Sequence, residues 1–209
     1  LPAVFNEATG TYDLYIRNTN NGGRIFITTR FSSKIKFFKK KYPQVKFVKL
    51  NIYNNKQIET LLKKIKPSVI FYFAGQSSPK KSFIKKKETF KSNYIGCKNI
   101  LEFIYKNRLD IKFFNATSSE MYGHIRGKIN LETPKQPLNP YGEAKKKSFE
   151  LVKKYRDEFG VSTYNTIMFN TDSFLRNKNF LIAQICIGAI KAFKNQKKLT
   201  LNNTIVSRE

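Results

Sequence analysis

The chain has 209 residues, and 40 Lys and Arg against 14 Asp and Glu give it a formal charge of +26. This length predicts one domain, or one domain with part of a second, and the 40% of hydrophobic residues exclude a disordered chain. No apolar run approaches the roughly 20 residues that a membrane span needs, and the first residues show no secretory signal pattern. The single histidine, His124, argues against a metal site, and none is predicted.

The positive charge is mostly lysine and is spread over every segment of the sequence. Such a charge favours nonspecific binding to polyanions. The sequence has no arginine-rich arm, no RNA-binding aromatic signature and no zinc-ligand spacing, so no specific nucleic-acid partner is predicted. Cys97 and Cys186 lie in apolar helical patterns, and buried free thiols favour a reducing, cytoplasmic location.

The elements alternate along the chain. In the irregular segment 1–23, residues 3–5 fit a short strand and residues 14–17 a helical fragment. Strands are predicted at 24–30, 46–50, 68–74, 111–117 and 162–170, and helices at 58–65, 90–104, from Pro140 to 159 and at 182–193. The continuous apolar run at 68–74 is typical of a strand buried on both faces. The alternation predicts an α/β fold, a doubly wound parallel sheet with helices on both faces.

Ligands of such folds bind beyond the carboxyl ends of the strands. Three predicted strand ends, 74–78, 117–120 and 170–173, carry small or polar residues, as a shared site requires. Lysine runs at 39–41, 85–87 and 145–147 fit solvated faces.

Tyr141 and Lys145 lie four residues apart at the start of a predicted helix, so they share one face. Asn139 is a suitable N-cap for this helix, and Pro140 suits its first position. A cation beside a phenol favours the phenolate, which would let the tyrosine act as a base near neutral pH. The same spacing also fits a surface tyrosine on a lysine-rich helix.

Three segments together favour the first interpretation: 73–78 (Phe-Ala-Gly-Gln-Ser-Ser), 115–123 (Asn-Ala-Thr-Ser-Ser-Glu-Met-Tyr-Gly) and 141–145 (Tyr-Gly-Glu-Ala-Lys). From about residue 23 to 209 the chain resembles the extended short-chain dehydrogenase/reductase family of sugar-nucleotide epimerases and dehydratases, and within it the GDP-mannose 4,6-dehydratases. The resemblance implies a Rossmann-like NAD(P)-binding domain at 1–195. It also implies that 196–209 begin a sugar-nucleotide lobe that is largely missing, and that the protein forms a homo-oligomer.

The resemblance implies four catalytic residues. Tyr141 would take the proton of the sugar 4-hydroxyl, and Lys145 would lower the tyrosine pKa and hold the nicotinamide ribose. Ser118 would hydrogen-bond the 4-oxygen. Glu120 would remove the C5 proton and assist loss of water from C6, which distinguishes a dehydratase from an epimerase. A helix cap or surface carboxylate is the other interpretation of Glu120.

The implied cofactor is NADP, with NAD as the alternative. Arg30 ends the second strand, where it suits a 2′-phosphate, although it fits an ordinary surface arginine equally well. Cofactor contacts are implied at Gly10, Arg30, Asn51, Ile52, Ala74, Gly75, Gln76, Tyr141, Lys145 and Asn170. Contacts with a nucleotide sugar, GDP-mannose in the first place, are implied at Ser77, Ser119, Asn170, Arg176 and Arg208.

The segment 1–23 departs from the family. Of the Gly-x-x-Gly-x-x-Gly pattern that receives a diphosphate, only Gly10 is present, with Glu7 and Asp13 at the outer positions. Further on, Thr171 replaces a histidine that is usual in the dehydratase group. Three hypotheses stay open: a dehydratase, an epimerase or reductase on another nucleotide sugar, and a non-catalytic relative that has lost its cofactor.

Overall fold

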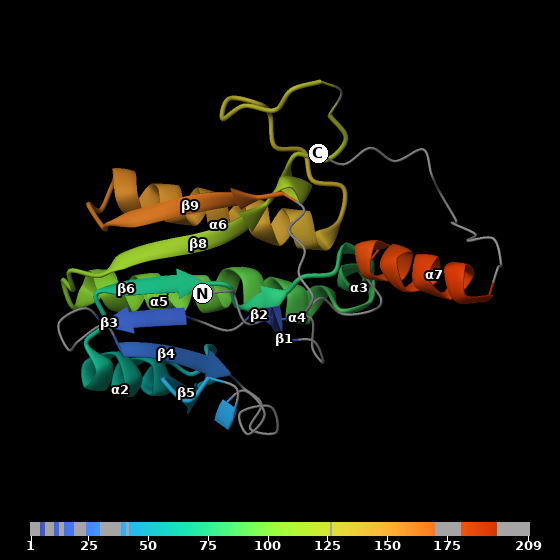
Figure 1. Ribbon diagram of the computed structural model, residues 1–209. Coiled ribbons are helices and arrows are strands. Elements are labelled where there is room, and N and C mark those ends of the chain that lie inside the picture. The colour runs from blue at the N-terminus through green and yellow to red at the C-terminus, as the bar shows by residue number, and fades with distance from the viewer. Residues whose placement is uncertain are drawn as a thin grey trace.

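The computed structural model describes residues 5–6, 11–12, 15–18, 24–29, 39–40, 42–125, 127–169 and 181–195. Their largest unit is a six-stranded sheet with the order β5-β4-β3-β6-β8-β9 (Figure 1). Its strands are β3 (Tyr15–Asn18), β4 (Arg24–Thr29), β5 (Val45–Lys49), β6 (Val69–Tyr72), β8 (Lys112–Ser118) and β9 (Thr163–Met168). A small second sheet joins β1 (Phe5–Asn6), β2 (Thr11–Tyr12) and β7 (Gly75–Gln76).

Four helices lie close to their predicted places: α2 (Asn55–Ile65), α5 (Gly96–Lys106), α6 (Pro140–Asp157) and α7 (Leu181–Asn195). Two short helices, α3 (Pro79–Ile84) and α4 (Lys86–Phe90), were not predicted. A π-helical turn, η1 (Lys91–Ile95), joins α4 to α5, and a 3₁₀ turn, η2 (Ser119–Met121), follows β8. Among the described helices, none combines the length and the apolar character that crossing a membrane requires.

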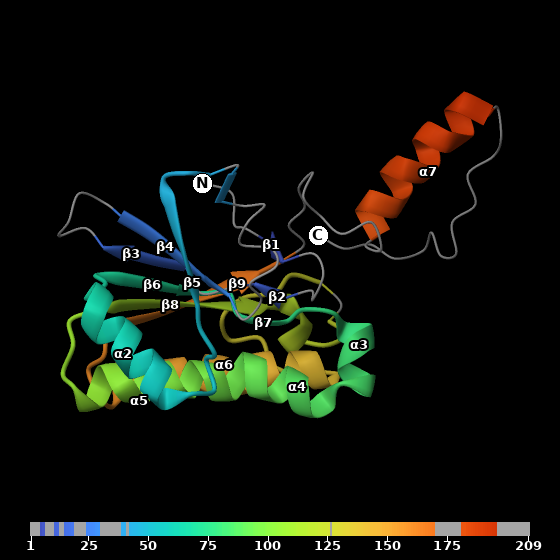
Figure 2. The same ribbon diagram turned by 90° about the horizontal axis from the view of Figure 1, so that it is seen from below.

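The sheet is parallel from β4 to β5 and from β6 through β8 to β9, which confirms the predicted Rossmann-like fold. The helices α2, α5 and α6 share one face of this sheet (Figure 2). Right-handed crossovers explain this placement, because the three connections from β5 to β9 run in the same direction across the sheet. From β4 to β5 the strand order runs in the opposite direction. Residues 39–40 of this connection are helical.

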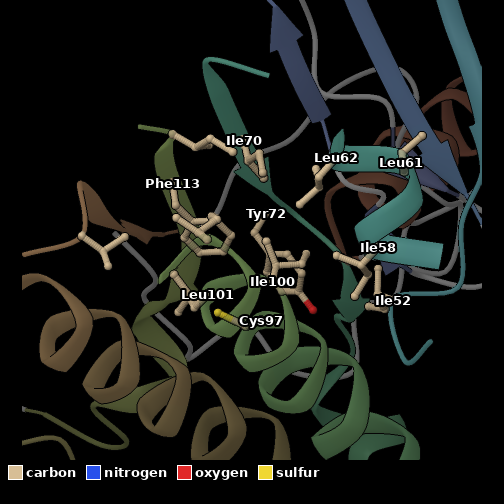
Figure 3. Packing of buried hydrophobic residues seen from close by; sticks show 14 of the residues in the cluster. Ile52, Ile58, Leu61, Leu62, Ile70, Tyr72, Cys97, Ile100, Leu101 and Phe113 are labelled. Atoms are coloured by element: carbon tan, nitrogen blue, oxygen red, sulfur yellow. The ribbon is translucent and has the colours of Figure 1, made fainter. Parts of the chain in front are cut away.

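The core lies between the sheet and this helical face (Figure 3). Its largest fully buried members come from α2, β6, α5 and β8: Ile58, Ile70, Tyr72, Ile100, Leu101, Ile104 and Phe113. Gly96 lets α5 approach β6, because a Cβ there would collide with the Tyr72 hydroxyl. That hydroxyl donates to the carbonyl of Ser92 at 2.6 Å, so the polar end of the buried ring has a partner.

One predicted element is wrong. Residues 14–17 were expected to be helical, but β3 is a strand that pairs antiparallel with both β4 and β6. Tyr15 and Ile16 favour a strand, and the Asn21-Gly22-Gly23 sequence before β4 favours a reversing turn between paired strands. The centre of the sheet is therefore occupied by a reversed strand in place of the parallel first strand of a doubly wound fold.

Candidate active site

The site is built first from the carboxyl end of β8. Ser118, the last residue of the strand, is buried and extended, and its Oγ accepts a hydrogen bond from the Glu120 backbone N–H at 3.3 Å. This serine therefore caps η2. The cap turns the chain sharply at the strand end, so that the serine hydroxyl and the Glu120 carboxylate come from the same turn.

The second part of the site is the start of α6. Asn139 is extended and caps the helix, because its Oδ1 accepts from the Gly142 N–H at 2.8 Å, and Pro140 takes the first helical position. Tyr141 and Lys145 are both buried, with the lysine Nζ 5.7 Å from the centre of the tyrosine ring. The predicted helix start and shared face are confirmed, and the surface-pair interpretation is wrong.

Lys145 is held from the strand side. Its Nζ donates to the Ala116 carbonyl of β8 at 2.7 Å, so one contact ties α6 to the strand that carries Ser118. Burial lowers the pKa of Lys145 from 10.5 to about 8, and the neighbouring Cys97 opposes this shift. The charge of Lys145 is therefore kept in a desolvated place, where its field acts strongly on nearby groups.

Glu120 is half-buried and faces the start of α6. One carboxylate oxygen accepts from the Asn139 side-chain amide at 2.8 Å. Gly142 allows the close approach, because a Cβ there would collide with the Glu120 carbonyl oxygen. Asn139 and Gly142 were missed as parts of the site. The signal for Gly142 was available, since a glycine in the first turn of a helix is costly unless another backbone comes near.

The β6 end is held by an internal network. Gln76 is buried, and its side-chain amide donates to the Ser78 carbonyl at 2.9 Å and to Thr89 Oγ1 at 3.1 Å. Gly75 has a φ of +154° and packs on Asn93, whose Oδ1 a Cβ would strike. The predicted contacts of Ala74, Gly75 and Gln76 with a cofactor would therefore use backbone, since the Gln76 side chain holds its own loop.

Two predicted cofactor contacts lie after β5. Asn51 is exposed, and its Oδ1 accepts from the Tyr53 N–H at 3.1 Å, which forms a local turn. Ile52 is buried in the core, and its carbonyl accepts from the Asn99 side chain at 3.1 Å. Its side chain therefore serves packing against α5.

The remaining predicted residues divide into two groups. Ser77 and Ser119 lie half-buried at the strand ends, next to the site. Five others lie outside the described residues: Gly10, Arg30, Asn170, Arg176 and Arg208. Within the described ranges, no group of three or more His, Cys, Asp or Glu could hold a metal ion.

A dinucleotide fits one end of this site better than the other. Tyr141, Lys145 and the backbone at Gly75 suit the nicotinamide end. At the diphosphate end, a doubly wound fold supplies a parallel strand, a glycine turn and a helix. Here β1 and β2 pair antiparallel on either side of residues 7–10, and Thr11 pairs with Gln76. The described residues of segment 1–23 do not supply that strand, turn and helix.

A Rossmann-like sheet with a serine at a strand end, a glutamate in the turn after it and a buried Tyr-x-x-x-Lys pair on the next helix is typical of one class, the short-chain dehydrogenases/reductases that act on nucleotide sugars. Solved structures of this class match the fold. The dTDP-glucose 4,6-dehydratase of Bacillus anthracis, in complex with NAD, is 26% identical, with a TM-score of 0.64 over 78% of this chain and 48% of that one. The UDP-glucuronic acid 4-epimerase of Bacillus cereus is 21% identical, with a TM-score of 0.66 over 81% and 52%.

The sequence comparisons narrow the class. The family model of GDP-mannose 4,6 dehydratase matches residues 17–209, and the chain belongs to this family. GDP-mannose 4,6 dehydratase 2 of Caenorhabditis elegans is 30% identical over 153 residues, 71% of this chain and 40% of that protein. GDP-mannose 4,6 dehydratase 1 of Arabidopsis thaliana is 32% identical over 151 residues, 69% and 42%. The chain thus spans less than half the length of these relatives.

Proposed function

We propose that this chain belongs to a lyase, an NADP-dependent nucleotide-sugar 4,6-dehydratase that converts GDP-mannose to GDP-4-keto-6-deoxymannose. The observation that carries the proposal is that hydrogen bonds hold together the elements that bear four groups. Lys145 donates a hydrogen bond to the strand that ends at Ser118, and Glu120 accepts one from Asn139, the cap of the helix that carries Tyr141. Membership of the GDP-mannose 4,6 dehydratase family supports the substrate.

The first task of these residues is to move the proton of the sugar 4-hydroxyl. Tyr141 accepts this proton as a phenolate, and the buried charge of Lys145 stabilises that phenolate. Ser118 donates a hydrogen bond to the 4-oxygen and orients it. A nicotinamide cofactor, when bound, would accept hydride from C4 and later return it to C6.

The second task is elimination, and it falls to Glu120. The 4-keto group makes the C5 proton acidic, and the Glu120 carboxylate removes it. The same carboxyl group then gives a proton to the leaving 6-hydroxyl, so that water departs and a C5–C6 double bond forms. The half-buried carboxylate sits one turn from Ser118, which suits a group that must reach the neighbouring carbon of the same sugar.

The wider assignments rest on the family resemblance. NADP is proposed over NAD because of Arg30, with Asn51, Ile52, Gly10 and the β6 end along the cofactor. Substrate contacts are proposed at Ser77, Ser119, Asn170, Arg176 and Arg208. We further propose a cofactor domain at 1–195, the start of a sugar-nucleotide lobe at 196–209, a homo-oligomer and a cytoplasmic location.

The test is Glu120→Gln in the protein at its natural full length, supplied with GDP-mannose and NADP. Dehydration should fall by about 10²–10⁴-fold, the range that general acid–base groups contribute, while NADPH binding by fluorescence stays unchanged. Glu143→Gln is the matched control, an exposed acid on α6 whose carboxylate lies 3.8 Å from Lys147. If 4-keto product forms at the wild-type rate in the Glu120 variant, the role of Glu120 in elimination is wrong.

One observation favours a second candidate, a relative that keeps the fold without cofactor chemistry. Two described strands of segment 1–23, β1 and β2, pair antiparallel with each other, and Thr11 of β2 pairs with Gln76, where a dinucleotide turn is needed. Titration of NADPH separates the candidates, because the relative would show no saturable fluorescence change.

A further inference from the structure

Asn139 makes two hydrogen bonds in opposite directions. Its Oδ1 accepts from the Gly142 backbone N–H at 2.8 Å, and its Nδ2 donates to Glu120 Oε2 at 2.8 Å. The first bond caps α6, and the second reaches across 19 residues to η2. A single planar amide therefore joins the helix that carries Tyr141 to the turn that carries Glu120.

The orientation of this amide follows from its partners. A carboxylate only accepts hydrogen bonds, and a backbone N–H only donates. Exchanging the oxygen and nitrogen of Asn139 would place an oxygen against the carboxylate and an NH₂ group against the N–H, with repulsion at both ends. Both partners thus select the same orientation of the amide. A hydrogen bond from an amide to a charged carboxylate is also stronger than one between two neutral groups.

We infer that Asn139 is a positioning residue that orients the Glu120 carboxylate for elimination while it caps α6. The inference rests on the proposed function. A glutamate side chain has three rotatable bonds, so a carboxylate that must meet one C–H bond gains from an anchor. The close packing of Gly142 on the Glu120 backbone fixes the other end of the same side chain.

Asn139→Ser separates the cap of α6 from the contact with Glu120. Serine is a good N-cap, but its short hydroxyl cannot bond the Gly142 N–H and the Glu120 carboxylate at the same time. The measurement is single-turnover kinetics of the protein at its natural full length with GDP-mannose and NADP. We expect elimination to slow by about 10–100-fold, as when a reacting group is misplaced, with KM within about twofold and NADPH still formed transiently. Asn139→Asp keeps the cap and sets a second carboxylate against Glu120, and it should slow elimination further.

Asn107→Ser is the matched control. Asn107 also ends a helix with a side-chain hydrogen bond, from its amide to the Phe103 carbonyl at 2.9 Å. It precedes the start of β8, whereas Ser118 of the site lies at the end of that strand. The control variant should leave every rate unchanged. Equal elimination rates in Asn139→Ser and Asn107→Ser would overturn the inference while the proposed function stands.

A thermal double-mutant cycle tests the contact without any turnover. Asn139→Ser and Glu120→Ala, alone and together, should show Tm changes that fail to add by about 2–5 °C, because residues in contact couple. Additive Tm changes would overturn the inference. A wild-type protein that forms no 4-keto product would reject the proposed function, and with it the role in elimination, whereas the cycle would still decide whether the contact exists.

Discussion

Two regions of this chain differ in how well they match the sequence pattern of the family. The proposed catalytic corner, Ser118 and η2 with the first turns of α6, keeps the hydroxyl, the carboxylate, the tyrosine and the lysine of the pattern. Short contacts such as Lys145 to Ala116 at 2.7 Å join these elements. The N-terminal segment, residues 1–23, keeps one glycine of three, and its described strands are antiparallel. We therefore expect the proposed catalytic residues and the cofactor-binding loop to be separable parts of this fold.

The family match divides the chain at nearly the same place. It begins at residue 17, inside β3, so residues 1–16 fall outside it and the whole catalytic corner falls within it. The family match therefore covers all the parallel strands of the sheet and only the last residues of the reversed strand β3.

The largest expected effect tests the catalytic corner. Tyr141→Phe removes the hydroxyl that takes the proton, so formation of 4-keto product should fall by about 10³-fold, measured at saturating GDP-mannose and NADP. Tyr155→Phe is the matched control, because Tyr155 is a buried tyrosine further along α6 that packs edge-on against Tyr105 and Phe159. A Tyr141→Phe protein that retains turnover would mean that the corner only resembles an active site.

The next effect tests the buried cation. The pKa of Lys145 is about 8 in the folded chain against an ordinary 10.5, so the unfolded state binds more protons between these values. The contribution of Lys145 to stability therefore rises as pH increases from 8 to 10.5. Relative to Lys145→Met, the wild-type free energy of unfolding should increase by about 3 kcal/mol across this window.

Urea unfolding at several pH values measures this difference, and the variant carries all the other lysines, so their titration cancels. A difference between wild type and Lys145→Met that stays flat from pH 8 to 10.5 would show that the lysine is solvated and that the corner is open to water.

The smallest expected effect tests the N-terminal segment. Glu7→Gly with Asp13→Gly removes two negative charges from the glycine-pattern positions, so NADPH should bind about tenfold more tightly, a change of about 1.4 kcal/mol. Glu59→Gln with Glu158→Gln changes the net charge equally at exposed ion pairs on and just after the helices α2 and α6. Equal dissociation constants in the two double variants would show that only net charge matters.

Most of the fold could be predicted because its signals are local. The apolar run at 68–74 became β6, and the Asn139-Pro140 start of α6 is a cap with its own hydrogen bond. The predicted helix at 14–17 failed because a four-residue segment carries too little pattern, and pairing with β4 and β6 decided its state.

How much of the site could be predicted from the sequence differs from residue to residue. Tyr141 and Lys145 followed from helical spacing. Gln76 and Ile52 were expected at the cofactor, yet their side chains serve the loop and the core, because burial and partners are set by distant segments such as Thr89 and Asn99. The catalytic roles of Ser118 and Glu120 stay predictions, and the Glu120→Gln variant tests the second of them.

By itself the sequence determined the alternation of strands and helices, the cap of α6 and the residue types of the catalytic corner, since each depends on neighbours within a few positions. Only the tertiary structure decided that Asn139 meets Glu120 and that the central strand β3 is reversed. These features depend on contacts between residues far apart in the chain, which no local pattern encodes.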